Sequence, residues 1–200
     1  LEDGRVMYMA RYILRPGFGD PPVPQEADTI GIWDQRRRDN EIVWNVADFV
    51  SPVERTIPSS SYTLPGHFLW GGCERDETVQ DWTHGNSAVM SADGSVLVSL
   101  RNLDQIISIA PGFGSNQWRL GGPGSDFTFP DPADRFYHQH SAIPLPNGNV
   151  LLFDNGNFRP NDEGGQHSRA LELKFDMETM TASKVWEYRH DPDIYAFCCS

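Results

Sequence analysis

The feature that most constrains the fold is a repeat of a tight turn followed by short β-rich segments. In the clearest copy, Asp93-Gly94 is a hairpin turn signal, and segments rich in Val, Ile and Leu follow at 96–100, 106–109 and 117–120. Together with the apolar residues before the turn, these segments predict four short antiparallel strands. Four strands within about 35 residues match the size of one β-propeller blade.

The same order occurs twice more along the chain. Downstream, Asn147-Gly148 precedes segments at 150–153, 170–175 and 184–188, and upstream, Asp3-Gly4 precedes segments at 6–9, 29–33 and 41–44. The last segment of each copy is centred on a tryptophan, which we expect to pack against the neighbouring sheet: Trp44, Trp118 and Trp186. Three copies predict at least three blades.

We therefore predict an all-β fold, a β-propeller with almost no helix beyond a turn near 46–49. The blade-like copies lie at about 1–48, 84–122 and 138–190 of a single partial propeller domain spanning residues 1–200. The Pro- and Ser-rich stretch 49–80 is predicted to be a long insertion, with smaller ones at 15–28 and 154–168. A closed propeller needs at least four blades. We thus expect either a piece of a longer protein or missing blades supplied from elsewhere.

The charge balance argues against binding to nucleic acid. The net charge is -12, whereas phosphate backbones and anionic membranes attract clustered Lys and Arg. The one basic run, Arg36-Arg37-Arg38, is followed directly by Asp39 and is interpreted as a solvated turn. The sequence contains no run of about 18 apolar residues, so no membrane span is predicted.

The three cysteines are Cys73, Cys198 and Cys199. They lack the CxxC spacing of a zinc site. A bridge between Cys73 and either Cys198 or Cys199 is the disulfide that the sequence allows, leaving one thiol over. Such a bridge favours an oxidising compartment.

Two polar clusters occupy equivalent places, just before the first strand of a copy. They read DWTHGNSA at 81–88 and YHQHSA at 137–142. This position places His84 and His140 at the start of an innermost strand, facing the central channel where propellers bind ligands, and a neutral imidazole serves as base or nucleophile near pH 7. The alternative is that the imidazoles hydrogen-bond the backbone and hold adjacent blades together. His138 either alternates with His140 on an extended strand or lies in the preceding loop.

A second group follows the turn signal Asp154-Asn155-Gly156. Arg159 or Arg169 could bring a guanidinium to the channel, where its planar fork suits sulfate, phosphate or carboxylate, or could instead form a surface ion pair. Imidazoles with one guanidinium make a positive pocket for an anionic group. Around the histidines no carboxylate or cysteine lies at ligand spacing, so neither a metal nor another cofactor is predicted.

The ordered motifs DWTHGNSAV, DGSVLVSLRNLDQIISI, WRLGG, HQHSAIPLPNGNVLLFDNG, SRALELKFD and VWEY resemble the arylsulfotransferase (aryl-sulfate sulfotransferase) family and its arylsulfotransferase-like relatives. The resemblance implies a secreted or periplasmic propeller of six blades, of which this chain covers about three to four. It also implies transfer of a sulfuryl group from a phenolic sulfate to a phenol through a sulfated histidine. The expected partners are therefore small aromatic sulfates and phenols.

The resemblance also assigns residues. His84 and His140 match the family's supporting histidines, and Arg159 most simply matches its arginine. The histidine that accepts the sulfuryl group follows the WEY strand in the family, so we expect it beyond this chain. Further expected substrate contacts are Asn86, His138, Asn155 and Arg169.

Two other classes of function stay open at the sequence level. One is a non-catalytic propeller that binds a glycan, a protein or an assembly partner through its channel or long loops. The other is a quinone- or metal-dependent oxidoreductase, although the repeats contain no dedicated cofactor motif.

Overall fold

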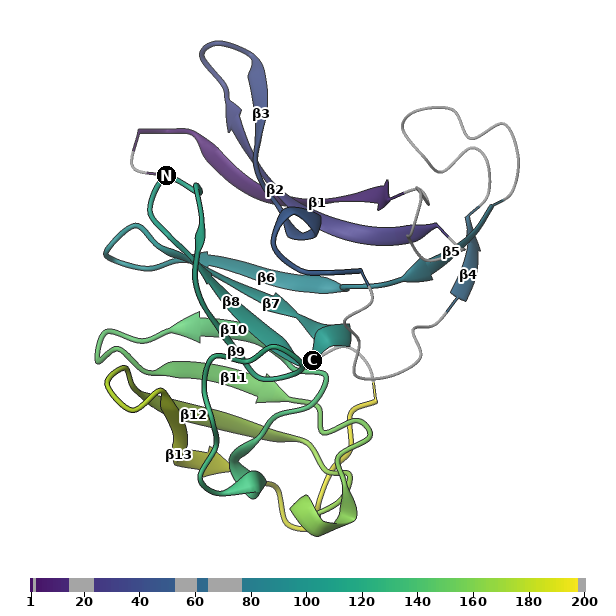
Figure 1. The fold of residues 1–200 in the computed structure, drawn as a ribbon, viewed down its shortest axis with the longest axis vertical. Helices are drawn as coiled ribbons and strands as arrows, with labels where there is room; N and C mark the ends of the chain where they lie inside the picture. Colours follow the sequence, from purple (N-terminus) through teal and green to yellow (C-terminus); the bar gives the residue numbers. More distant parts are fainter. Residues whose placement is uncertain (2, 15–23, 53–60, 65–76, 198–200) are drawn as a thin grey trace. The chain divides into compact units, whose positions relative to one another are not determined.

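A computed structural model describes residues 1, 3–14, 24–52, 61–64 and 77–197. The chain divides into two compact units, Leu1–His84 and Gly85–Ser200. The predicted all-β class is confirmed for the described residues (Figure 1), whose helical turns are all short 3-10 turns. These turns are Val46–Asp48 (η1), Arg101–Leu103 (η2), Pro132–Asp134 (η3) and Asn161–Glu163 (η4). Propeller closure and blade number stay predictions.

The first unit contains one five-stranded sheet with the order β1-β2-β5-β4, and β3 also pairs with β2. Its strands are β1 (Val6–Leu14), β2 (Gln25–Asp34), β3 (Asp39–Asn45), β4 (Ser61–Leu64) and β5 (Glu77–Asp81). The β2–β5 pair is parallel and the others are antiparallel. The predicted insertion 49–80 therefore contains β4 and most of β5, and β2 begins within the predicted insertion 15–28. Val79 of β5 is fully buried, which explains why this segment joins the sheet.

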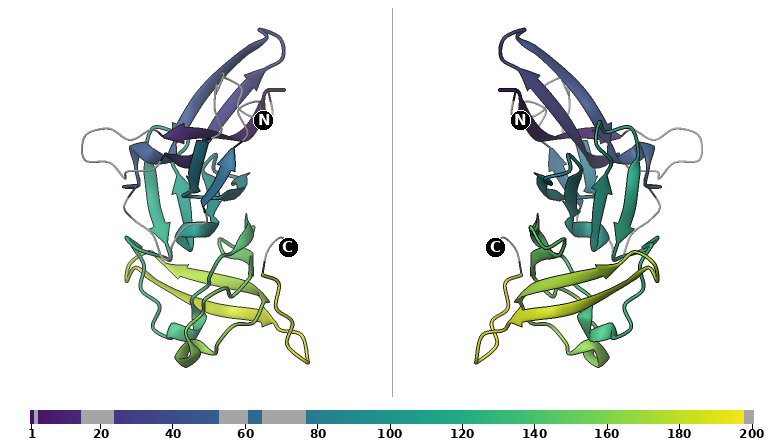
Figure 2. Two further views of the ribbon diagram at one scale, coloured as in Figure 1. Left: turned by 90° about the vertical axis from the view of Figure 1, so that its right-hand side faces the viewer. Right: turned by 90° about the vertical axis from the view of Figure 1, so that its left-hand side faces the viewer.

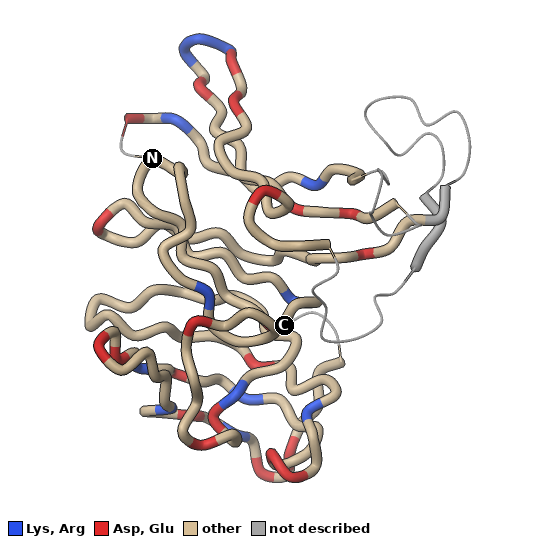
Figure 3. The backbone as a smooth tube through the Cα atoms, viewed as in Figure 1, with Lys and Arg blue, Asp and Glu red and all other residues tan. Residues whose placement is uncertain are grey.

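The basic run of the first unit lies in the exposed turn between β2 and β3 (Figure 3). The Asp34 carboxylate accepts hydrogen bonds from the backbone N–H groups of Arg36 and Arg37, at 2.9 and 3.1 Å. The interpretation as a solvated turn is confirmed.

The second unit contains two four-stranded antiparallel sheets, each with its strands in chain order. Figure 2 shows the last two strands as a long twisted pair. The predicted strands and hairpins are confirmed here, with β6 (Gly85–Met90), β7 (Val96–Leu100), β8 (Gln105–Ile109) and β9 (Asn116–Leu120) in one sheet. The other consists of β10 (His140–Pro144), β11 (Val150–Asp154), β12 (Arg169–Asp176) and β13 (Thr181–Tyr188).

The two hairpin turns repeat one another in detail. Asp93 Oδ1 accepts from the Ser95 N–H at 3.0 Å, and Asn147 Oδ1 accepts from the Asn149 N–H at the same distance. Both are Asx turns followed by a strand. The DG and NG signals therefore have the same physical basis.

The core of the second unit lies between its two sheets. It is a cluster of buried aliphatic and aromatic side chains that includes Leu97, Ile106, Leu120, Phe127, Phe136, Leu152, Leu171 and Leu173.

The three tryptophans differ in their packing. Trp118 of β9 packs edge-on against Phe127 at 5.7 Å and tilted against Phe175 of β12 at 5.4 Å, as predicted for a contact with the neighbouring sheet. Trp44 instead stacks on Phe49 at 6.1 Å. Trp186 of β13 is 48% exposed, and its packing against a neighbouring sheet stays a prediction.

Candidate functional site

His84 ends the first unit in a segment fixed by several hydrogen bonds. Its Nδ1 bonds the Asp81 carboxylate, Thr83 Oγ1 donates to Asp28 at 2.6 Å, and the Trp82 side chain is fully buried. The His84 backbone is left-handed, with a φ of 50°. Because a carboxylate accepts from Nδ1, Nε2 is the nitrogen that donates when the ring is protonated and accepts when it is neutral.

His140 is the first residue of β10 and is half-buried. It pairs with Phe153 of the antiparallel neighbour β11, so Asn155, just beyond the end of that strand, comes to lie beside it. The distance from His140 Nδ1 to Asn155 Oδ1 is 2.7 Å. The structure therefore places two of the predicted site residues in direct contact.

His138 is not on the strand, so the expectation that it alternates with His140 on one face is wrong and the loop alternative is confirmed. Its φ is 55° and its side chain is 1% exposed. Asp104 Oδ1 accepts from both the His138 backbone N–H, at 2.6 Å, and Nδ1, at 2.9 Å. Within the described ranges, Nε2 is buried without a hydrogen-bond partner. The ring meets Phe158 edge-on at 5.6 Å, so His138 is a core residue.

Asn86 and Gln139 join the two sheets of the second unit. Asn86 of β6 donates to the Gln139 carbonyl at 2.9 Å and accepts from the Ser141 N–H at 3.2 Å. The Gln139 amide is buried and donates to Ser99 Oγ and Gln105 O, at 3.0 and 2.9 Å. Asn86 and Gln139, rather than the imidazole of His140, therefore make these hydrogen bonds between the two sheets.

Arg159 and Arg169 both pair with Asp154, in a buried network rather than at the surface. Arg159 Nη2 bonds Asp154 Oδ2, and Arg169 Nε donates to the same oxygen at 2.9 Å. The other Asp154 oxygen accepts from the Tyr137 N–H at 2.9 Å and the Gly156 N–H at 3.1 Å. The side chains of both arginines are at most 3% exposed. The structure therefore gives these cations a buried anionic partner.

Sequence reasoning missed Asp104 and Asp154 as organising residues. Asp154 was recognised only as part of a turn signal, and nothing local marks Asp104, because its partner His138 is far along the chain. The φ of 50° at Asp104, which aspartate tolerates better than most residues, is a conformational signal that the sequence does not display.

Two groups near this network have shifted pKa values. Burial raises the pKa of Tyr137 well above its ordinary value, and the hydrogen bond from its hydroxyl to Glu163, at 2.6 Å, adds to the shift. Burial also lowers the pKa of His167, and the nearby guanidinium groups of Arg159, Arg189 and Arg169 add to it. The Tyr137 phenol thus stays protonated and the His167 ring is neutral at pH 7.

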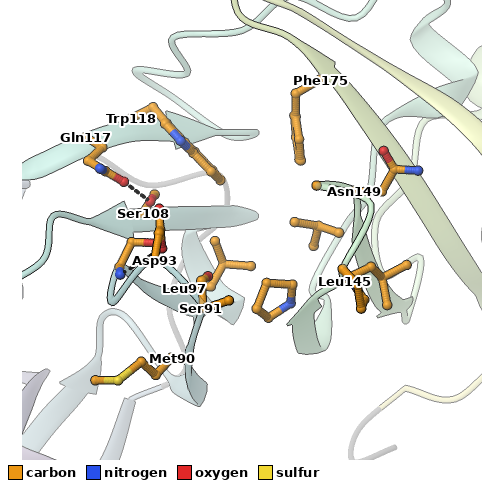
Figure 4. Close-up of a pocket in the computed structure, with 16 residues that line it drawn as sticks. Met90, Ser91, Asp93, Leu97, Ser108, Gln117, Trp118, Leu145, Asn149 and Phe175 are labelled. Carbon is orange, nitrogen blue, oxygen red and sulfur yellow. Dashed lines mark hydrogen bonds between the residues drawn. The ribbon is translucent and has the colours of Figure 1, made fainter.

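A cavity of about 440 Å³ lies between the two sheets at their hairpin ends (Figure 4). Trp118, Phe175, Leu97 and Leu145 converge on it, and among the described residues that line it the one charged side chain is Asp93. A sulfuryl group is anionic and needs cationic or N–H partners. The cavity is therefore unsuited to it, and it lies at the end of β10 opposite to His140.

The structure also bears on metals, cysteines and membrane spans. In the described ranges, no group of three or more His, Cys, Asp or Glu side chains is placed to hold a metal ion. None of the helices described there has the length and apolar character to cross a membrane. The disulfide prediction for Cys73, Cys198 and Cys199 lies outside the described residues.

The fold and site define an all-β protein of mainly antiparallel sheets, in which histidine rings are held through Nδ1 by side-chain oxygens at the entry to a strand. The family described as Arylsulfotransferase (ASST) matches residues 23–200. The chain therefore belongs to the arylsulfotransferase family, as its motifs indicated. A search of curated protein sequences found no match.

Proposed function

We propose that the protein transfers a sulfuryl group from a phenolic sulfate to a phenol through a sulfohistidine. Family membership supports the reaction class. The observation that carries the proposal within the molecule is the contact between His140 Nδ1 and Asn155, which holds an imidazole at the entry to β10. Location outside the cytoplasm and a six-bladed propeller are part of the same proposal.

The chemistry divides into two half-reactions. In the first, the bond between the donor's phenolic oxygen and sulfur breaks, an N–S bond forms on the accepting histidine, and the phenolate leaves. In the second, the acceptor phenol attacks sulfur, the N–S bond breaks and the phenol proton is released. The accepting histidine is expected downstream of the WEY strand. His84 and His140 have the predicted role of contacting the sulfuryl oxygens, where charge develops, through the Nε2–H that each ring carries when it is protonated.

The remaining predicted residues receive positioning roles in this proposal. Arg159 and Arg169 hold Asp154, which precedes Asn155, and His138 holds Asp104. Neutralisation of the leaving phenolate by Arg159 stays a prediction, as does substrate contact by Asn86.

The full-length protein is assayed with an aryl sulfate donor and a phenol acceptor. His84→Ala and His140→Ala are each expected to lower turnover by about 100-fold or more, the usual range for loss of a hydrogen-bond donor to developing charge. Ile143→Ala, at an exposed position on the same strand as His140, is the matched control and keeps wild-type turnover. Unchanged turnover in both histidine variants contradicts the proposal.

A further inference from the structure

The segment 194–197, here called the strap, is held along its backbone by polar groups of the second unit. Ser168 makes two of the bonds: its N–H donates to the Ile194 carbonyl at 2.9 Å, and its Oγ accepts from the Ala196 N–H at 2.8 Å. Three side-chain donors complete the attachment, namely Asn155 Nδ2 to Ala196 O at 2.8 Å, Asn157 Nδ2 to Phe197 O at 2.6 Å and Arg101 Nη2 to Phe197 O at 3.2 Å.

This attachment is polar rather than hydrophobic. The anchoring residues Asn155, Asn157 and Ser168 are at most 2% exposed, whereas the large strap side chains point outward: Ile194 is 49%, Tyr195 41% and Phe197 58% exposed. Buried amides and hydroxyls are costly unless they are hydrogen-bonded. The strap therefore satisfies buried donors, and core packing does not explain its position.

Asn155 connects the strap to His140. A primary amide has one donating and one accepting end, and a carbonyl only accepts, so the Asn155 NH₂ group must face Ala196 O. Its Oδ1 consequently faces His140 Nδ1 and requires a proton on that nitrogen. Ser168 fixes the Asn155 backbone as well, because its Oγ donates to the Asn155 carbonyl at 2.9 Å.

We propose that Ser168, Asn155 and the strap form a positioning relay that holds the neutral ring of His140 as the Nδ1–H tautomer. Asn155 then acts through His140, in place of the direct substrate contact expected from the sequence. Ser168 becomes a functional residue that the motifs did not indicate. This tautomer leaves the lone pair of the neutral ring on Nε2. Only the role of that nitrogen toward the sulfuryl group rests on the proposed function.

The test is ¹⁵N NMR of histidine-labelled protein, at a pH about two units above the ordinary histidine pKa of about 6.5. The His140 signals are identified by their loss in His140→Ala. The wild type is expected to show a protonated Nδ1 and an unprotonated Nε2. Asn155→Leu, of similar size but without polar atoms, is expected to show a mixture of both tautomers.

Two further variants separate the ends of the relay. Asn155→Asp keeps the acceptor for His140 and is expected to keep the Nδ1–H signature. Ser168→Ala is expected to show a partial shift of the tautomer and faster amide exchange at Ala196. Asn147→Asp is the matched control, because the equivalent turn of the other sheet carries Asp93, and it should leave every signal of His140 unchanged.

The relay is overturned if the wild type shows an Nε2–H tautomer, or if folded Asn155→Leu keeps the wild-type tautomer. If Asn155→Leu does not fold, Ser168→Ala decides, since an unchanged tautomer and unchanged exchange at Ala196 overturn the relay. In the full-length protein, Asn155→Leu is expected to lower turnover by about 10- to 100-fold, the range known for loss of the hydrogen-bond partner that orients a metal-bound histidine. Wild-type turnover in both His84→Ala and His140→Ala would contradict the proposed function and leave the relay standing, because the tautomer is read without any activity assay.

Discussion

His138 and His140 are two residues apart, yet the structure places them in opposite circumstances. His138 is buried against the Asp104 carboxylate, whereas His140 is half-buried against the neutral amide of Asn155. Gln139 between them is fully buried and bonds Ser99 and Gln105 of the neighbouring sheet. The anchored glutamine and the left-handed backbone at His138 send the two rings in different directions. The motif HQH therefore contains one structural and one candidate functional histidine.

Asp154 fixes the surroundings of both histidines. Its carboxylate accepts from the Tyr137 N–H beside His138, and it directly precedes Asn155, the partner of His140. Asp154→Leu leaves the buried Arg159 guanidinium without its carboxylate partner and leaves Arg169 with Glu187 alone. We expect the free energy of unfolding to fall by about 3–5 kcal/mol, as for other broken buried ion pairs, measured by chemical denaturation. Asp162→Leu, at an exposed site, is the control and should change it by less than about 0.5 kcal/mol. A loss as small as that of the control would contradict the assigned network.

Removal of the His138 ring should cost less. His138→Leu leaves Asp104 without its Nδ1 donor, and the expected loss is about 1.5–3 kcal/mol, the range for a hydrogen bond to a charged group. His138→Asn should lose less than half as much, because asparagine keeps an N–H donor and tolerates a positive φ. Equal losses in the two variants, measured by urea denaturation, would show that the bond to Asp104 is unimportant.

A third histidine, His167, extends the comparison, because its contribution to the free energy of unfolding depends on pH. Because burial and nearby arginines lower its pKa in the folded state, the unfolded state binds the proton more readily once the pH falls below about 6.5. The free energy of unfolding should therefore decrease between about pH 7 and pH 5. His167→Asn should make this decrease shallower in denaturation curves measured across that range. An identical pH dependence in the variant would show that His167 does not contribute.

The sequence predicted the parts of the fold that depend on local signals. The DG and NG turns with the strands around them gave both sheets of the second unit. The parallel pairing of β2 with β5 was not predictable, because it joins residues 55 positions apart, such as Gln25 and Gln80, and no turn signal accompanies it.

The candidate site was predicted only in part, because local signals identify residues but not their partners from distant segments. Motif position identified His140 and Asn155, and the antiparallel register of β10 and β11 brings them together. The roles of His138, Arg159 and Arg169 depend on Asp104 and Asp154, whose pairing follows from backbone conformation rather than residue type. Family likeness assigned residues by motif, and the structure adds that His138, Arg159 and Arg169 are buried and paired with carboxylates.

The most direct test measures both turnover and the free energy of unfolding for His138→Asn and His140→Ala in the full-length protein. The account predicts that His138→Asn lowers stability and keeps most of the turnover. It predicts that His140→Ala lowers turnover by about 100-fold while changing stability by less than about 1 kcal/mol. Loss of turnover in His138→Asn with wild-type turnover in His140→Ala would contradict the division of roles between these two histidines.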